Sequence, residues 1–174
     1  MESFNASEPH SERLQVSPEV ARLLSPETSD IIRLRAVHGQ MALSETDQVM
    51  LWFLVLSGDS SRELKNEALT ALRQATPAGL KPVLKDRTLH PRVLDFLLRA
   101  RYNDLPVVIF LRSNPSVPQR SWLAIFQRCS YEILSFFFSD QAPFKLSNDE
   151  LKAARSNPQT TEVLQAHIDQ QLSI

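Results

Sequence analysis

Lysine and arginine are concentrated in the middle of the chain, and these side chains are the ones most suited to binding an anionic ligand. Residues 81–128 carry nine basic and three acidic residues, a net charge of +6, whereas residues 1–80 carry −4 and residues 129–174 carry −3. A concentration of this kind can bind phosphate, nucleic acid or an acidic protein segment. The alternative interpretation is a solvated surface that balances the acidic ends. The basic residues are Lys81, Lys85, Arg87, Arg92, Arg99, Arg101, Arg112, Arg120 and Arg128.

Four of these arginines are the expected contacts of a partner. Arg92 and Arg99 are seven residues apart, so they share one face of a helix. Arg112 and Arg120 flank the next expected helix start, where free N–H groups add positive potential. A guanidinium group can bind a carboxylate or a phosphate through two parallel hydrogen bonds, which a lysine ammonium group cannot do. We therefore predict a partner site formed by Arg92, Arg99, Arg112 and Arg120.

Residues for catalysis or metal binding do not occur in recognisable patterns. No histidine has a second histidine or a cysteine at the i, i+4 spacing of metal ligands. His90 precedes Pro91 and is expected in a turn, and Cys129 is expected as a buried thiol. The sequence contains no GxSxG, Walker or HExxH motif. We expect no enzyme activity, no cofactor and no metal. The four histidines are His10, His38, His90 and His167.

The composition narrows the class of protein. A chain of 174 residues fits one domain, for which we expect residues 17–174 to form a single unit after a flexible arm of residues 1–16. The single cysteine excludes an intrachain disulfide and fits a reducing compartment, so we expect a cytoplasmic protein. The N-terminus does not resemble a signal peptide, and no apolar run is long enough for a membrane span.

The glycine and proline contents favour helices. The chain has 3 glycines, where an average composition gives about 12. Hairpins and phosphate-binding loops need glycine, so this scarcity disfavours both. The 11 prolines fit the first position of a helix, where the missing N–H costs nothing. We predict an all-α fold of short helices.

Polar caps followed by proline predict where the helices begin. Ser, Thr, Asp and Asn at an N-cap accept hydrogen bonds from first-turn N–H groups. The predicted starts with proline are Ser17-Pro18, Ser25-Pro26, Thr76-Pro77, His90-Pro91, Asp104 with Pro106, Asn114-Pro115 and Asn157-Pro158. Capping boxes are predicted at Ser44 with Asp47, Ser60 with Glu63 and Ser147 with Glu150.

The tetrapeptide RSNP occurs twice, at residues 112–115 and 155–158, which are 43 positions apart. We interpret each copy as a helix start in a degenerate repeat, in which helical hairpins must stack to bury their apolar faces. His90-Pro91 is a weaker third copy, 24 residues before the first. A period near 43 suits a helix pair, and a period of 24 suits an α-helix that alternates with a 3₁₀ helix.

At these residues the sequence resembles bacterial HEAT-like and leucine-rich-variant repeat proteins. The likeness rests on HPRVLDFLLR, RSNPSVPQRSWLAIF, RSNPQTTEVL and LSGDSSRELKNEALTALRQA, and covers about residues 44–168. It implies an α-α superhelix of stacked helix pairs that is used for binding. Leucine-rich-variant proteins can carry an iron–sulfur cluster, but this chain has no cysteine cluster to hold one.

These features lead to two functional hypotheses. The first is a non-catalytic protein-interaction or scaffold module that binds another protein through an acidic segment. The second is binding of the nucleic-acid backbone by the basic middle. Three consecutive phenylalanines, Phe136 to Phe138, cannot all face one side of a helix, so at least one is expected to face a neighbouring repeat or a partner.

Overall fold

The computed structural model describes residues 14–139 and 142–173, and in these residues all regular structure is α-helical. The predicted all-α class is confirmed. Residues 1–13 of the predicted arm lie outside the described residues. The helices are α1 (Pro18–Leu24), α2 (Asp30–Val37), α3 (Glu45–Ser57), α4 (Arg62–Gln74), α5 (Pro77–Lys85), α6 (Pro91–Ala100), α7 (Leu105–Arg112), α8 (Gln119–Phe126), α9 (Tyr131–Phe137), α10 (Asn148–Arg155) and α11 (Glu162–Leu172).

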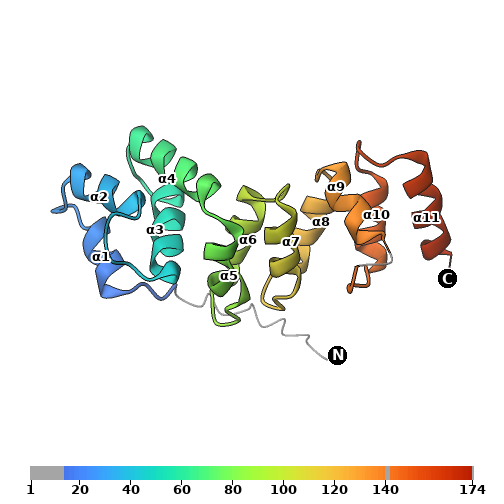
Figure 1. The fold of residues 1–174 in the computed structure, drawn as a ribbon, viewed down its shortest axis with the longest axis horizontal. Helices are drawn as coiled ribbons and strands as arrows, with labels where there is room; N and C mark the ends of the chain where they lie inside the picture. Colours follow the sequence, from blue (N-terminus) through green and yellow to red (C-terminus); the bar gives the residue numbers. More distant parts are fainter. Residues whose placement is uncertain (1–13, 140–141, 174) are drawn as a thin grey trace, which may run out of the picture.

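The helices follow one another in chain order along the long axis of the molecule (Figure 1). The contacts between them repeat in threes. The first helix of each group packs against the third, as α2 packs on α4, α5 on α7 and α8 on α10. The second helix packs on the first helix of the next group, as α3 packs on α5 and α6 on α8. The third helices begin at Arg62, Leu105 and Asn148, which are 43 residues apart in each case.

A period of 43 residues therefore contains three helices, where the sequence analysis expected a pair. The helices are short, and the longest have 13 residues. One face of each is buried in a continuous core of leucine, valine and aromatic side chains. In the described part of the chain, no helix combines the length and the apolar character that crossing a membrane requires.

Most of the predicted helix starts are present. The side chains of Ser17, Thr76 and Asp104 accept a hydrogen bond from a first-turn N–H, and Nδ1 of His90 accepts from the N–H of Arg92 at 3.1 Å. Ser147 forms a full capping box in which its own N–H donates to Glu150. The local sequence alone determines these contacts, which is why the cap pattern predicted them.

Four of the predicted starts are wrong: Ser25-Pro26, Ser60 with Glu63, and the asparagines of the two RSNP motifs, which are described below. Ser25-Pro26 ends α1 and leads into a turn, because the following helix begins at Asp30 after Ser29. The cap of α4 is Ser61, whose side chain accepts from the N–H of Leu64, and not the preceding Ser60.

The first RSNP motif has a different role from the one predicted. Helix α8 begins at Gln119, so Asn114 is not its cap. The side chain of Asn114 is buried, and its amide donates to the carbonyls of Leu84 and Asp86, both at 2.9 Å. Its Oδ1 accepts from the N–H of Ser116 at 3.0 Å. Asn114 therefore fastens the loop after α7 to the C-terminal end of α5.

The second RSNP motif repeats this arrangement one period later, and here too α11 begins several residues downstream, at Glu162. The buried amide of Asn157 donates to the carbonyls of Phe126 and Cys129, at 2.9 and 3.0 Å. Its Oδ1 accepts from the N–H of Gln159 at 2.8 Å. The loop after α10 is thus fastened to the end of α8. We call Asn114 and Asn157 the asparagine clamps.

Side chains also cap the ends of other helices. Of the described residues, only Gly39, just after α2, has a positive φ, 68°. Arg33 donates to carbonyls at the end of α1, Trp52 to one at the end of α2, and Arg101 to two at the end of α4. The final carbonyls of a helix have no partner within it. The end of α2 also has a glycine-containing C-terminal motif, in which Gly39 allows the N–H of Gln40 to donate to the carbonyl of Arg35. At the ends of α1 and α4, arginines of neighbouring elements supply the partners instead.

The three phenylalanines of α9 and its C-cap pack within the molecule. Phe137 is buried and contacts the rings of Trp122 and Phe126. Phe138 packs edge-on against the ring of His167 on α11, with the ring centroids 5.9 Å apart. One of the three therefore faces a neighbouring unit, as the expectation allowed.

Candidate functional site

Three of the four predicted arginines line one groove. Arg92 and Arg99 project from α6, and Arg120 lies in the first turn of α8. The groove runs across α3, α6 and the start of α8 and has a volume of about 660 Å³. We call it the α3–α6–α8 groove.

The floor of the groove is apolar. Phe53 and Leu54 of α3 and Phe96 of α6 line it, together with Leu14 from the segment before α1. The rings of Phe53 and Phe96 meet edge to face, with centroids 5.3 Å apart and an angle of 67° between their planes. These side chains pack on the core but are only partly buried. They can therefore accept an apolar group from a ligand.

The arginines around the groove differ in their partners. Nε of Arg99 donates to both carboxylate oxygens of Asp95, at 3.0 and 2.9 Å, and the Arg99 side chain is half exposed. The side chains of Arg92 and Arg120 are exposed and form no ion pair with a described residue. Two guanidinium groups at the groove are therefore available for a ligand.

Arg112, the fourth predicted contact, serves a different purpose. Its Nη1 lies 2.5 Å from Oε1 of Glu150 and its Nη2 lies 3.0 Å from Oε2, so the two side chains pair in two places. The guanidinium also lies over the ring of Trp122, 5.0 Å from the centroid. The side chains are only 14% and 4% exposed, so this pair ties α7 to α10. Arg112 does not line the α3–α6–α8 groove.

The environment of Glu150 favours its charged form. Burial alone would raise the pKa of this carboxyl, but hydrogen bonds from Arg112 and from the N–H and hydroxyl of Ser147, with the charge of Arg112, outweigh it. The pKa of Glu150 is therefore lower than usual. Sequence reasoning interpreted Glu150 only as a helix cap, because its partner is 38 residues away.

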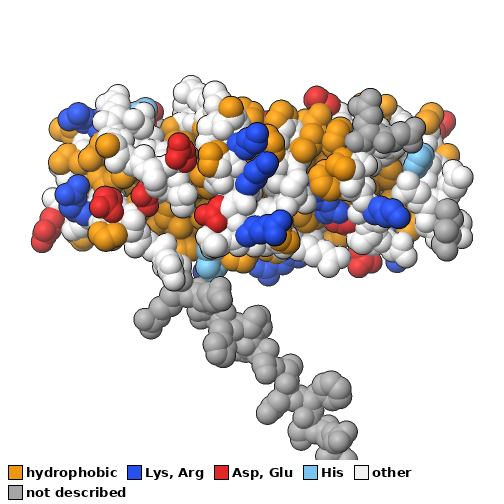
Figure 2. Space-filling model, turned by 60° about the horizontal axis from the view of Figure 1, so that its bottom comes forward, with side chains coloured by type: hydrophobic (Ala, Val, Ile, Leu, Met, Phe, Trp, Pro, Cys, Tyr) orange, Lys and Arg blue, Asp and Glu red, His pale blue; other side chains and the backbone are white. Residues whose placement is uncertain are grey.

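The other basic residues of the middle segment are dispersed. Arg101 is buried and pairs with Asp104 as well as the end of α4. The ammonium groups of Lys81 and Lys85 lie over the ring of Phe110, 5.5 and 5.9 Å from its centroid. Figure 2 shows basic side chains over the middle of the row, and both acidic and basic ones towards the α1–α3 end. The positive charge is therefore not confined to the groove.

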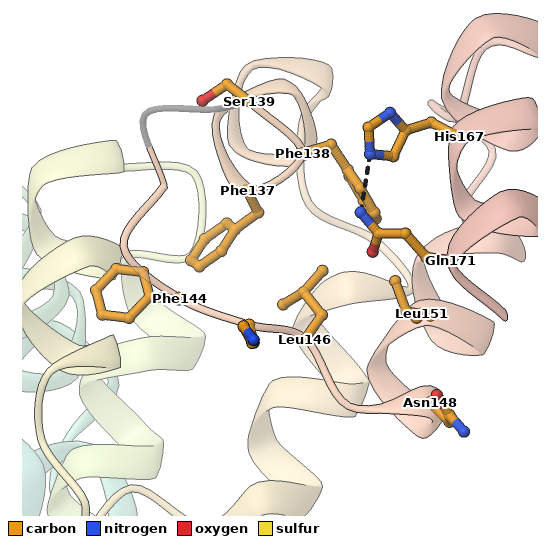
Figure 3. A pocket seen from close by; sticks show the side chains of 10 residues that line it. Phe137, Phe138, Ser139, Phe144, Leu146, Asn148, Leu151, His167 and Gln171 are labelled. Carbon is orange, nitrogen blue, oxygen red and sulfur yellow. Dashed lines mark hydrogen bonds between the residues drawn. The ribbon is translucent and has the colours of Figure 1, made fainter. Parts of the chain in front are cut away.

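A second pocket, of about 440 Å³, lies between α9, α10 and α11. Figure 3 shows Phe137 and Phe144 on one side and His167 and Gln171 on the other, with Leu146 between them. Nε2 of His167 and the amide of Gln171 are 2.8 Å apart. The arginines predicted for the partner site do not line this pocket.

The single thiol is poorly placed for catalysis. Cys129 is fully buried, and burial raises the pKa of its thiol to about 12. A nucleophilic cysteine needs the thiolate, which this environment disfavours. The described histidine, cysteine and acidic residues form no group that could hold a metal ion.

No family model matches the chain, and comparison with curated proteins and with solved structures found no similar protein. The candidate site is therefore defined by its own geometry, which is an apolar floor, two available guanidinium groups and one Asp–Arg pair. This combination suits binding of an anionic ligand that also has an apolar part.

Proposed function

We propose that this chain is a non-catalytic protein-interaction or scaffold module of helical-repeat type, and that its partner docks an acidic segment in the α3–α6–α8 groove. One observation carries the proposal: Arg92, Arg99 and Arg120 surround a floor made by Phe53 and Phe96. Aromatic and arginine side chains are the types that contribute most energy at protein interfaces.

The repeated contacts support the helical-repeat part of the proposal. Units of about 43 residues with three helices fall in the size range of HEAT and armadillo repeats. We propose that the row is an α-α superhelix of the HEAT-like kind that the sequence resembles. Proteins of this architecture use extended surfaces across successive repeats for binding.

The titrating groups support the non-catalytic part of the proposal. The pKa is shifted for Cys129, Glu150 and Arg155. Cys129 is buried as a thiol, and the other two are held in ion pairs between helices. None of these groups lines the groove, so we propose a module without cofactor or metal. Cytoplasmic location is part of the proposal, since the thiol suits a reducing compartment.

Nucleic-acid binding is the second candidate function. The observation that favours it is the excess of positive charge in residues 81–128, in which Lys81 and Lys85 are exposed as well as Arg92 and Arg120. A backbone ligand would neutralise several of these groups at once, and its affinity would fall steeply with salt.

Site-specific photo-crosslinking tests the proposal. A photoreactive amino acid replaces Ser57, which lines the groove, or Thr70, an exposed residue of α4 outside it. We expect a crosslinked protein from position 57 and not from position 70, and we expect nuclease treatment to leave it unchanged. Equal capture at both positions would contradict the groove as the site, and loss of the crosslink with nuclease would favour the second candidate.

A further inference from the structure

The α3–α6–α8 groove has the properties of a selective site, and Asp95 is the residue that gives it selectivity. Resting on the proposed function, we infer that the groove binds peptide segments in which an apolar side chain is flanked by carboxylates. We infer also that Asp95 excludes phosphate backbones from it.

The floor determines the apolar part of the ligand. Phe53, Leu54 and Phe96 are partly exposed, and the volume of about 660 Å³ lies in the range of sites that enclose small ligands. Covering apolar surface of this kind with an apolar group removes it from water and so stabilises the complex. A peptide with a leucine or phenylalanine side chain supplies that group, whereas a phosphodiester backbone does not.

The arginines of the groove determine which charges the ligand carries beside its apolar side chain. Arg92 belongs to the first turn of α6 and Arg120 to the first turn of α8, so the two guanidinium groups come from different helices that line the same groove. Each can bind a carboxylate in two places. A ligand that places one carboxylate before its apolar side chain and one after it can pair with both.

Asp95 lies between Arg92 and Arg99 on α6 and lines the same groove. Its side chain is 21% exposed, and both of its oxygens accept from Nε of Arg99. The Nη groups of Arg99 have no hydrogen bond to a described residue, so they can still contact a ligand. The pair therefore positions Arg99 while it keeps a negative charge in the wall of the groove.

This charge affects the two ligand classes differently. Arg92 and Arg99 are separated by about 10 Å along the helix axis. Successive phosphates of a nucleic-acid strand are closer together than this; in duplex DNA each strand carries one negative charge for about every 3.4 Å of the helix axis. A strand that contacted both arginines would thus bring a phosphate close to the Asp95 carboxylate. A peptide can instead place uncharged residues at that position.

Fluorescence anisotropy with defined probes tests the inference. The first probe is a labelled peptide with Leu-Phe between two pairs of glutamates, the second is the same peptide with Ser-Ser in place of Leu-Phe, and the third is a labelled oligothymidylate. We expect the first probe to bind at least tenfold more tightly than either of the others. Equal binding of the two peptides, or stronger binding of the oligonucleotide, would overturn the inference.

Variants identify the residues responsible. Arg92→Glu with Arg120→Glu is expected to weaken binding of the first probe at least tenfold. The control pair Arg35→Glu with Arg73→Glu, at exposed residues outside the groove, is expected to have little effect.

Asp95→Asn is expected to raise the affinity for oligothymidylate at least tenfold. The matched control Asp149→Asn changes the net charge equally at an exposed site outside the groove. If Asp95→Asn and Asp149→Asn change the affinity for oligothymidylate equally, Asp95 is not the selective residue.

The failure of this inference is distinguishable from that of the proposed function. A protein crosslinked at position 57, together with failure of the acidic apolar peptide, would leave the interaction module intact and reject the inferred ligand. The absence of a position-specific crosslink, with the probes also unbound, would reject both. Thermal unfolding of each variant, measured by circular dichroism, establishes that the compared proteins are folded.

Discussion

At the scale of single residues, the asparagine clamps explain why the RSNP tetrapeptide occurs twice. In each copy one amide satisfies two carbonyls at the end of a helix that lies 28 to 31 residues earlier. A buried carbonyl without a partner costs about 1–3 kcal/mol, so each clamp prevents a substantial loss. The asparagine acts through this distant contact, and the proline after it continues the turn.

Replacement of a clamp is expected to destabilise the protein strongly. Asn114→Ala or Asn157→Ala should lower the free energy of unfolding by about 2–4 kcal/mol, because two carbonyls lose their donor. Urea denaturation measures the change. Asn66→Ala, at an exposed position of α4, is the matched control and should change stability by less than about 0.5 kcal/mol. Equal effects at positions 66 and 114 would contradict the role of the clamp.

The Arg112–Glu150 pair makes stability depend on pH. Because the pKa of Glu150 is lower in the folded state, the folded protein binds this proton less readily than the unfolded chain. The contribution of Glu150 is present above the unfolded pKa of about 4.3 and is lost as the pH falls further. Urea denaturation between about pH 6 and about pH 3 should show this decrease.

The Glu150→Gln variant is the control for this pH dependence. It should be about 3 kcal/mol less stable near neutral pH, since it leaves the buried guanidinium of Arg112 without a counter-charge. Its stability should also fall less steeply in acid. If the variant loses as much stability in acid as the original chain, other carboxyl groups cause the pH dependence.

At the scale of helices, most N-terminal ends could be predicted, whereas C-terminal ends that depend on contacts with other elements could not. An N-cap depends on residues within three positions, so Ser17, Thr76 and Ser147 were identified from sequence alone. At the other end, the partner of a final carbonyl belongs to a different element, as with Arg101 at the end of α4. Sequence spacing contains no sign of such a contact until the packing of the helices is known.

The start of α4 allows a direct test of cap assignment, because two serines are adjacent. Ser61→Ala should destabilise the protein by about 1 kcal/mol, since it removes the acceptor for the N–H of Leu64. Ser60→Ala should have little effect, because Ser60 lies one position before the cap. Thermal unfolding of the two variants makes the comparison, and a larger loss for Ser60→Ala would contradict the assignment.

At the scale of the whole molecule, the groove was partly predictable from the sequence. Arg92 and Arg99 share a helix face because of their spacing, and Arg120 joins them because α8 packs on α6. Arg112 was indistinguishable in sequence from these three, because its partner Glu150 follows 38 residues later. The aromatic floor was also missed, since Phe53 belongs to α3 and Phe96 to α6, and only the packing of these helices brings the two rings together.

Because the helices are arranged in a row, we expect a destabilising substitution to affect mainly the unit that contains it. Each unit contacts mainly its neighbours, so its stability is approximately a sum of local terms. Trp52 lies in α3 and Trp122 in α8, so variants that retain only one of them report on different units. Glu150→Gln should shift the urea midpoint reported by Trp122 more than that reported by Trp52. Equal shifts would show that the row unfolds as one cooperative block.

The asparagine clamps also bear on how the chain acquires its structure during synthesis on the ribosome. Each clamp reaches back only 28 to 31 residues, and both carbonyls that it binds have already been made when the asparagine is added. The second and third groups of three helices can therefore each close without waiting for the C-terminus. We therefore expect the row to fold from its N-terminus during translation, one group of three helices after another.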